Sequence, residues 1–168
     1  MPTAREPLLD AVVQAAQGAV VEREFPLAGF VRLRDRLAET GGVAHVRLVL
    51  RTVDAVPAGA LDVRAGVTLI CQRCLQPMPH DLRADSRLAF VKQESNRVPA
   101  GHEAITGDPK RVDLAGLVED ELLLALPVIA RHAPGADCRL PADVPPAEEP
   151  VTPGMRRPFA GLKDLLKH

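Results

Sequence analysis

Two cysteines separated by two residues, Cys71 and Cys74 in the sequence LICQRCLQP, have the types and spacing that most directly indicate chemistry. A CxxC pair supplies two thiolates, which is half of the ligand set of a tetrahedral zinc ion. The same spacing serves thiol–disulfide exchange where the pair opens a helix after a strand. The third interpretation is that the thiols are reduced, partly buried and chemically idle, as is common for free cysteines.

A second group of ionisable side chains is the acidic run Glu119, Asp120 and Glu121. Paired carboxylates perform acid–base or metal chemistry only where they converge. Three consecutive residues of a helix point to different sides, so we expect these acids to lie on a solvated helix face. The sequence has no glycine-rich phosphate loop, no HExxH motif and no Ser-His-Asp arrangement. We therefore expect that the protein is not an enzyme.

The elements that must position the cysteines are strands. Residues 43–53, 61–71 and 80–91 alternate apolar and polar side chains with a period of two. This period carries Cys71 to the interior side at the end of the second strand. The segment Pro57-Ala58-Gly59 predicts the turn before that strand, and the short connections predict an antiparallel sheet with one solvated face. A strand on each side places the CxxC pair in a turn, which argues against the redox interpretation.

Helices are predicted on both sides of these strands. Residues 7–27 read as an extended or partly helical lead-in, and residues 28–40 place three apolar side chains on one helical face. Residues 93–112 are polar and read as a long surface loop. Asp113 is suited to N-cap the strongest helix, which we expect to run from Leu114 until a proline ends it.

The end of the chain has a different composition. Residues 141–157 are rich in proline and acids and predict a linker, and residues 158–168 predict a short amphipathic helix. Its apolar side could dock on a groove, through the following residues: Phe159, Leu162, Leu165 and Leu166. The sequence thus predicts one α+β domain over residues 1–140, with a small antiparallel sheet, a packed helix and a CxxC knuckle, followed by the linker and the terminal helix.

Composition restricts the class of function. The formal net charge of −1 gives no global basic field that would attract nucleic acid or a membrane. The chain has no Trp, no Tyr and four Phe, which argues against modules that stack bases on aromatic platforms. Three cysteines do not form a disulfide framework, and we see neither a signal peptide nor a membrane span. We expect a cytoplasmic protein.

Three blocks, CQRCL, VDLAGLVEDELLLALPV and RPFAGLKDLLK, occur in this order and together resemble the YceD family, also called DUF177. The resemblance covers most of the chain, and the block around Glu119, Asp120 and Glu121 is its most specific part. Members of this family are bacterial and plastid proteins linked to the accumulation of 23S ribosomal RNA. The resemblance therefore implies a cytoplasmic ribosome-biogenesis factor without a known catalytic activity.

The resemblance also suggests where the other two metal ligands would come from. Family members often carry a second cysteine pair after the leucine-proline block, and here His132 and Cys138 follow it. Cys71, Cys74, His132 and Cys138 would make a Cys3His site for structural zinc. Idle thiols remain the alternative.

Arginines supply the local signal for contact with RNA or with a ribosome-assembly protein. If the outward sides of the strands align, Arg47, Arg51, Arg83 and Arg87 form a basic stripe, and Arg73 lies beside it at the knuckle. We expect this surface to bind ribosomal RNA or an assembly factor, with no membrane and no small-molecule substrate. Two rival functions remain open, a zinc-stabilised adaptor that binds only proteins and a thiol oxidoreductase.

Overall fold

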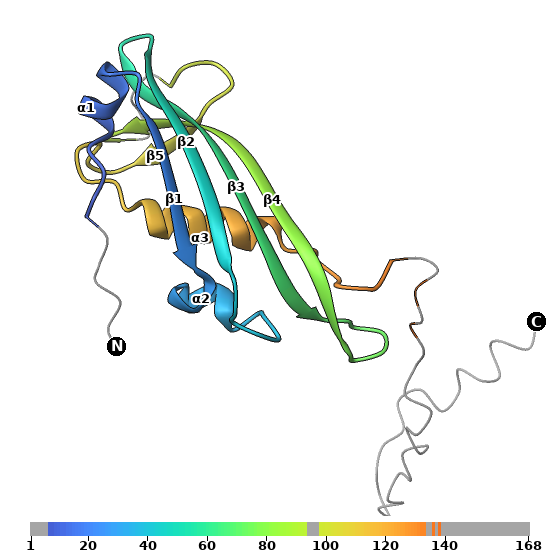
Figure 1. Cartoon of the computed structure of the whole chain (residues 1–168). Coiled ribbons are helices and arrows are strands. Elements are labelled where there is room, and N and C mark those ends of the chain that lie inside the picture. Colours follow the sequence, from blue (N-terminus) through green and yellow to red (C-terminus); the bar gives the residue numbers. More distant parts are fainter. Residues whose placement is uncertain (1–6, 94–97, 134–135, 137, 139–168) are drawn as a thin grey trace, which may run out of the picture.

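Five strands form one sheet in the order β1-β2-β3-β4-β5, and a helix lies across one of its faces (Figure 1). This computed structural model describes residues 7–93, 98–133, 136 and 138. Along the chain, the elements are α1 (Ala11–Ala16), β1 (Val20–Pro26), the 3₁₀ turn η1 (Leu27–Gly29), α2 (Val31–Arg34), β2 (Val43–Val53), β3 (Val56–Ile70), β4 (Pro77–Val91), β5 (Glu103–Thr106) and α3 (Leu114–Ala125).

The mixed α+β class is confirmed, whereas the sheet is larger than the sequence suggests. Strands β1 to β4 are antiparallel neighbours, and β5 pairs in parallel with the end of β4. Strand β1 lies in the expected lead-in, after a helix that Asp10 caps by accepting hydrogen bonds from the N–H groups of Val12 and Val13. Strand β5 lies inside the expected loop of residues 93–112. Its four residues are too short to show a period of two.

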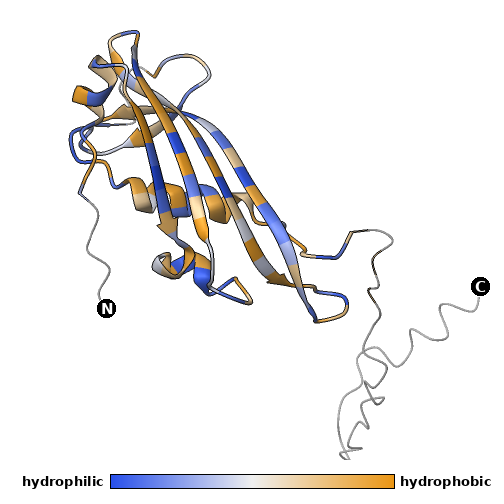
Figure 2. Cartoon of the chain, in the orientation of Figure 1, coloured by the Kyte–Doolittle hydropathy of each residue, from blue (hydrophilic) through white to orange (hydrophobic). Residues whose placement is uncertain are grey.

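The alternation in the three predicted strands is confirmed, as the bands of colour along β2, β3 and β4 show (Figure 2). The position of the first turn is wrong. Strands β2 and β3 meet at Asp54 and Ala55, which both have positive φ, as a two-residue hairpin turn requires. Pro57 and Gly59 lie within β3. A strand glycine can mark a close approach, and a Cβ on Gly59 would lie 2.8 Å from a methyl group of Leu48.

The helix predicted over residues 28–40 is much shorter in the structure. Only η1 and the four residues of α2 are helical, although Phe30 and Leu33 are buried as expected. The chain then turns to meet the end of β3, where the N–H of Ala38 donates to the carbonyl of Thr68. The chain beyond Arg34 therefore bonds to the sheet at Ala38 and does not continue the helix.

Helix α3 covers the inner face of the sheet. Its predicted cap is confirmed, because a carboxylate oxygen of Asp113 accepts from the N–H of Gly116 at 3.1 Å. The helix ends at Ala125, two residues before Pro127. Its apolar side packs on the strands in a single hydrophobic cluster, to which α1, β1, β2, β3 and β4 also contribute.

The described residues do not include every predicted element. The linker at 141–157 and the terminal helix at 158–168, with Phe159, Leu162, Leu165 and Leu166, lie outside them, so the division into a domain, a linker and a helix remains a prediction. Among the helices within the described ranges, none combines the length and the apolar character needed to cross a bilayer.

Candidate metal centre

The CxxC pair lies in the turn between β3 and β4. Cys71 follows the last residue of β3 on the inner side and is fully buried, as the alternation of the strand predicts. The N–H of Cys71 donates to the carbonyl of Gln76, and the N–H of Leu75 donates back to the carbonyl of Cys71. Leu75 has a φ of 60°, an uncommon conformation for a residue other than glycine. The turn is thus held in a conformation that brings Cys74 back toward the interior.

The segment after α3 is fixed against this turn by its main chain. The N–H of Gln72 donates to the carbonyl of Ala130 at 2.8 Å. This bond places His132 beside Cys74, whose sulfur lies 3.4 Å from the imidazole Nδ1 atom. Cys138 reaches the same place, with its sulfur 3.7 Å from that of Cys71.

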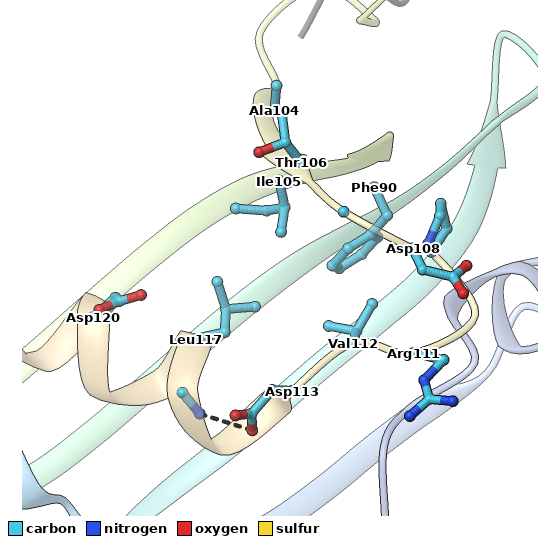
Figure 3. A pocket seen from close by; sticks show the side chains of 13 residues that line it. Phe90, Ala104, Ile105, Thr106, Asp108, Arg111, Val112, Asp113, Leu117 and Asp120 are labelled. Atoms are coloured by element: carbon cyan, nitrogen blue, oxygen red, sulfur yellow. Dashed lines mark hydrogen bonds between the residues drawn. The ribbon is translucent and has the colours of Figure 1, made fainter. Parts of the chain in front are cut away.

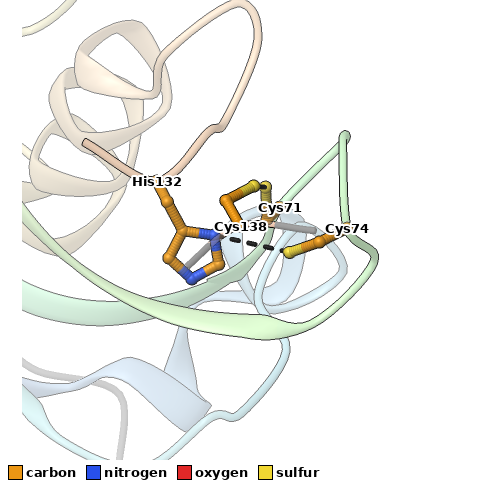
Figure 4. A group of neighbouring side chains, drawn as sticks. All are labelled: Cys71, Cys74, His132 and Cys138. Carbon is orange, nitrogen blue, oxygen red and sulfur yellow. Dashed lines mark hydrogen bonds between the residues drawn. The ribbon is translucent and has the colours of Figure 1, made fainter. Parts of the chain in front are cut away.

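The structure therefore brings together all four residues that the sequence suggested (Figure 4). Their ligand atoms, three sulfurs and one nitrogen, all lie within 4.8 Å of one another. The sulfur–sulfur distance of 3.7 Å is far longer than a disulfide bond, and all three cysteines are free. The cluster of Cys71, Cys74, His132 and Cys138 could hold a metal ion.

The thiols that touch differ in acidity. Hydrogen bonds from the main-chain N–H of Cys74, opposed by burial and reinforced by the N–H groups of Arg73 and His132, lower the pKa of Cys71 to about 5. Burial, together with the neighbouring sulfurs, raises the pKa of Cys138 to about 11. In the metal-free cluster at neutral pH, the Cys138 thiol is therefore the donor and the Cys71 thiolate the acceptor of their contact.

The acidic run on α3 does not form a solvated face, and this expectation is wrong for two of its three members. Glu119 and Glu121 are each only 8% exposed, and Asp120 alone points to solvent. Glu121 accepts a 2.7 Å hydrogen bond from the hydroxyl of Ser86 on β4. Glu119 binds the start of α2 through Arg32. Both buried acids thus make structural contacts between elements.

Four of the five predicted arginines share the face of the sheet that lies opposite α3. Arg47 and Arg51 come from β2, Arg83 and Arg87 from β4, and all four are exposed. Arg73 lies in the CxxC turn, beyond the strand ends. Strand β3 runs between the two pairs, so the arginines form two separate rows.

Acids alternate with these arginines on this face of the sheet, which lies opposite α3 and is called the open face below. Arg47 pairs with Glu22 at 3.4 Å, and Arg64 of β3, which the sequence reasoning missed, pairs with Asp62 at 3.0 Å. The Arg64 guanidinium is the main cause that lowers the pKa of Asp62. Period-two alternation in residues 61–71 could have identified Arg64 beforehand. The remaining arginines of the face, Arg51, Arg83 and Arg87, make no ion pair within the described residues.

A cavity of about 480 Å³ opens between β5 and the start of α3 (Figure 3). Its acids already make structural contacts: Asp113 caps α3, Asp120 binds Arg32 at 2.6 Å, and Asp108 accepts from the N–H of Lys110. Each of these acids in the described lining of the cavity therefore already has a hydrogen-bond or ion-pair partner.

Comparisons with known proteins agree with the three sequence blocks. The family model described as "Large ribosomal RNA subunit accumulation protein YceD" matches residues 60–166. A protein of that name from Haemophilus influenzae is 33% identical over an alignment of 111 positions, which covers 61% of this chain and 62% of the relative. The chain thus matches less than two thirds of the length of this relative. No solved structure matches the chain.

The matched stretch contains most of β3, the CxxC turn, β4, β5 and α3, together with His132 and Cys138. It also reaches into all three sequence blocks on which the resemblance rested. Since the family model covers well over half of the residues, the chain belongs to the YceD family of large ribosomal RNA subunit accumulation proteins.

Proposed function

We propose that this chain is a non-catalytic factor that supports the accumulation of 23S ribosomal RNA in the cytoplasm, by binding RNA or a ribosome-assembly protein. The observation that carries this proposal is the family match over residues 60–166, because the family is named for that role. The metal cluster and the open sheet face suggest how such a factor would be built.

Zinc is the metal that best fits the cluster. With ordinary zinc bond lengths, two sulfur ligands of a tetrahedral site lie about 3.8 Å apart, and a sulfur and a nitrogen about 3.6 Å. The two closest contacts of the cluster are 3.7 Å between the sulfurs of Cys71 and Cys138, and 3.4 Å between Cys74 and His132. Three sulfurs and one imidazole also match the preference of zinc for soft ligands. Bound zinc would fasten the segment after α3 to the end of the sheet.

The open face of the sheet is the proposed surface for RNA. Arginine guanidinium groups match phosphate geometry, and Arg51, Arg83 and Arg87 make no ion pair within the described residues. The acids between the arginines keep the field of the whole face weak, so recognition would rest on individual phosphate contacts.

The two rival functions receive less support. An adaptor that binds partners through an acidic helix would need exposed acids, and Glu119 and Glu121 are buried. An oxidoreductase would place the CxxC pair at the start of a helix, and here the pair joins two strands. We also propose that neither a membrane nor a small-molecule substrate is among its partners.

Depletion in the natural host tests the proposed function directly. Cells that lack the chain should contain less 23S ribosomal RNA relative to 16S ribosomal RNA, and the wild-type gene should restore the ratio. An unchanged ratio in depleted cells would contradict the proposal. A variant with Cys71→Ser and Cys74→Ser should restore the ratio poorly if zinc maintains the working surface.

Binding in vitro separates RNA contact from contact with proteins alone. Purified chain should retard 23S ribosomal RNA fragments in a gel, with an affinity that falls as salt rises. Arg47→Glu with Arg51→Glu should weaken binding several-fold. Arg34→Glu with Arg111→Glu makes the same change in net charge away from the sheet and should have little effect. Equal losses in both variants would show that the open face is not the site.

A further inference from the structure

Most of the outer edge of β4 has no neighbouring strand in the part of the chain that the structure describes. Strand β4 spans Pro77–Val91, and β5 pairs only with Leu88 to Val91. In Figure 1, the long lower part of β4 forms the border of the sheet. An edge of this length presents unpaired N–H and C=O groups, which is a template for another strand.

The main-chain groups on this edge can be assigned from two hydrogen bonds. Next to the start of β4, the carbonyl of Gln76 accepts from Cys71 at the end of β3, so even-numbered residues bond toward β3. At the other end, the carbonyl of Val91 accepts from Gly107 on the outer side. Because the direction of the main-chain N–H and C=O groups alternates along a strand, the N–H groups of Asp81, Arg83 and Asp85 point away from β3, toward the free edge of the sheet. Pro79, one of the two prolines at the start of β4, limits the free stretch at one end, and β5 limits it at the other.

The side chains along this stretch alternate in charge: Asp81, Arg83, Asp85 and Arg87 all lie on the open face. Toward β3, two of them meet their own charge, since Arg83 lies opposite Arg64 and Asp85 opposite Asp62. Like charges directly opposite each other on neighbouring strands are destabilising. Asp85 has a positive neighbour diagonally across from it, Arg64, whose pKa is raised by the hydrogen bond to Asp62 and also by the charge of Asp85. Partners of opposite charge placed directly opposite these side chains could come from a second strand across the open edge.

We propose that two copies of this chain pair along β4, antiparallel, with Ala84 opposite Ala84 of the second copy. In this register, Arg83 faces Asp85 of the other copy and Asp81 faces Arg87, so the two-fold axis makes four pairs of opposite charge. Because only odd-numbered residues have their N–H groups on this edge, the register can shift only by two residues at a time. Such a shift places Arg83 opposite Arg83 in one direction and Asp85 opposite Asp85 in the other. The charges therefore select one register. The paired stretch, from Asp81 to Arg87, is the stretch between Pro79 and β5. Arg47 and Arg51 on β2 lie outside these pairs, so in the paired form the phosphate contacts of the open face would rest on β2.

The inner side of the same edge also suits a second copy. Leu82, Ala84 and Ser86 carry no charge, whereas the edge strand β1 has Arg23 among its inward-side residues, a feature that discourages pairing. Leu124 lies one turn beyond Glu121, which contacts β4, and is 81% exposed. A two-fold axis at Ala84 would place the second α3 on the same side of the joined sheet, where it could cover this leucine.

The molar mass of the full-length chain in solution tests the pairing, by sedimentation velocity over a range of concentrations. Wild-type protein should approach twice 18.0 kDa, and Arg83→Asp should shift it to 18.0 kDa. The exchange Arg83→Asp with Asp85→Arg restores opposite charges across the axis and should restore the doubled mass. Arg51→Asp, on a strand away from this edge, should leave the mass unchanged. Wild-type protein that stays at the single mass, or an exchange variant that stays there, would overturn the proposal.

Hydrogen exchange locates the interface independently of mass. The amides of Asp81, Arg83 and Asp85 should exchange slowly in wild-type protein at high concentration and at least ten times faster in Arg83→Asp. Amides of even-numbered β4 residues, which bond to β3, should remain protected in both and so report that the variant is folded. Fast exchange of the three amides in a protein of doubled mass would show that the copies meet elsewhere and would contradict the proposal.

Discussion

The carboxylate of Glu119 on α3 accepts a 2.6 Å hydrogen bond from the backbone N–H of Arg32, which lies 87 residues earlier in the chain. The same oxygen accepts from the N–H of Leu33 at 3.1 Å, and the other oxygen binds the Arg32 guanidinium at 3.0 Å. Glu119 thus satisfies N–H groups that the short helix α2 leaves unpaired at its start. The contact joins a residue within the family match to a segment that lies before it.

Replacing Glu119 with alanine should lower the free energy of unfolding by about 2–3 kcal/mol, because the N–H of the buried Leu33 would lose its acceptor. Chemical denaturation measures this change. Asp120→Ala is the matched control on the same helix. It removes an exposed ion pair with Arg32 and should cost less than about 1 kcal/mol. Equal losses from both substitutions would show that the hydrogen bonds to the backbone of α2 contribute little.

The same contact makes stability depend on pH. Burial alone would raise the pKa of Glu119, but the N–H groups of Leu33 and Arg32 and the Arg32 guanidinium hold it below the ordinary value of a glutamate. A depressed pKa in the folded state stabilises the protein above the pKa of the unfolded chain, about 4.3, and this contribution is lost as pH falls through the folded-state value. The stability difference between wild type and Glu119→Gln should therefore be constant above about pH 5 and shrink in more acidic buffer. A difference that does not change with pH would contradict this assignment.

Local patterns are sufficient to predict the central strands and the CxxC half of the metal cluster. Alternation along residues 61–71 places Cys71 inside at the end of a strand, and this depends only on the pleat of the backbone. The cap at Asp113 is likewise local, since its acceptor and donor are three residues apart. His132 and Cys138 lie in a distant segment, and the sequence indicates them as the other two ligands only through the resemblance to the YceD family.

The errors concern contacts that a local pattern does not contain. Glu119 and Glu121 look like solvated acids because their partners, Arg32 and Ser86, lie 87 and 35 residues away. The segment Pro57-Ala58-Gly59 predicts a turn because proline and glycine often mark turns. In the structure, Gly59 lies within β3, where a Cβ would approach a methyl group of Leu48 to 2.8 Å.

Gly59→Ala should destabilise the protein by about 1–3 kcal/mol, because the added methyl group would need space in a fully buried part of the core. Its Cβ would lie 2.8 Å from a methyl group of Leu48 and 3.3 Å from one of Leu50. Gly66→Ala on the same strand is the control, since its Cβ would meet nothing closer than 3.8 Å, and its effect should lie within about 0.5 kcal/mol of zero. Thermal and chemical denaturation of the two variants test this. A neutral Gly59→Ala would show that Leu48 and Leu50 can repack.

Metal content tests the cluster of Cys71, Cys74, His132 and Cys138. Protein purified without chelator should contain one zinc ion per chain, because all four ligand atoms lie within 4.8 Å of one another. Removal of the metal with a strong chelator should lower the melting temperature, since zinc bound only to the folded state contributes to folding. Elemental analysis and thermal unfolding of the same samples measure both effects.

His132→Ala should lose most of the zinc and melt at a lower temperature, because it removes the one nitrogen ligand of the cluster. His102→Ala removes a histidine whose ring contacts the carbonyl of Ala100 in a loop, outside the cluster, and should keep the full metal content. His132→Cys would restore a fourth soft ligand and should recover zinc binding in part. Full zinc content in His132→Ala would show that this histidine is not a ligand. No zinc in the wild-type protein, with three freely titratable thiols, would instead show that the cysteines are idle.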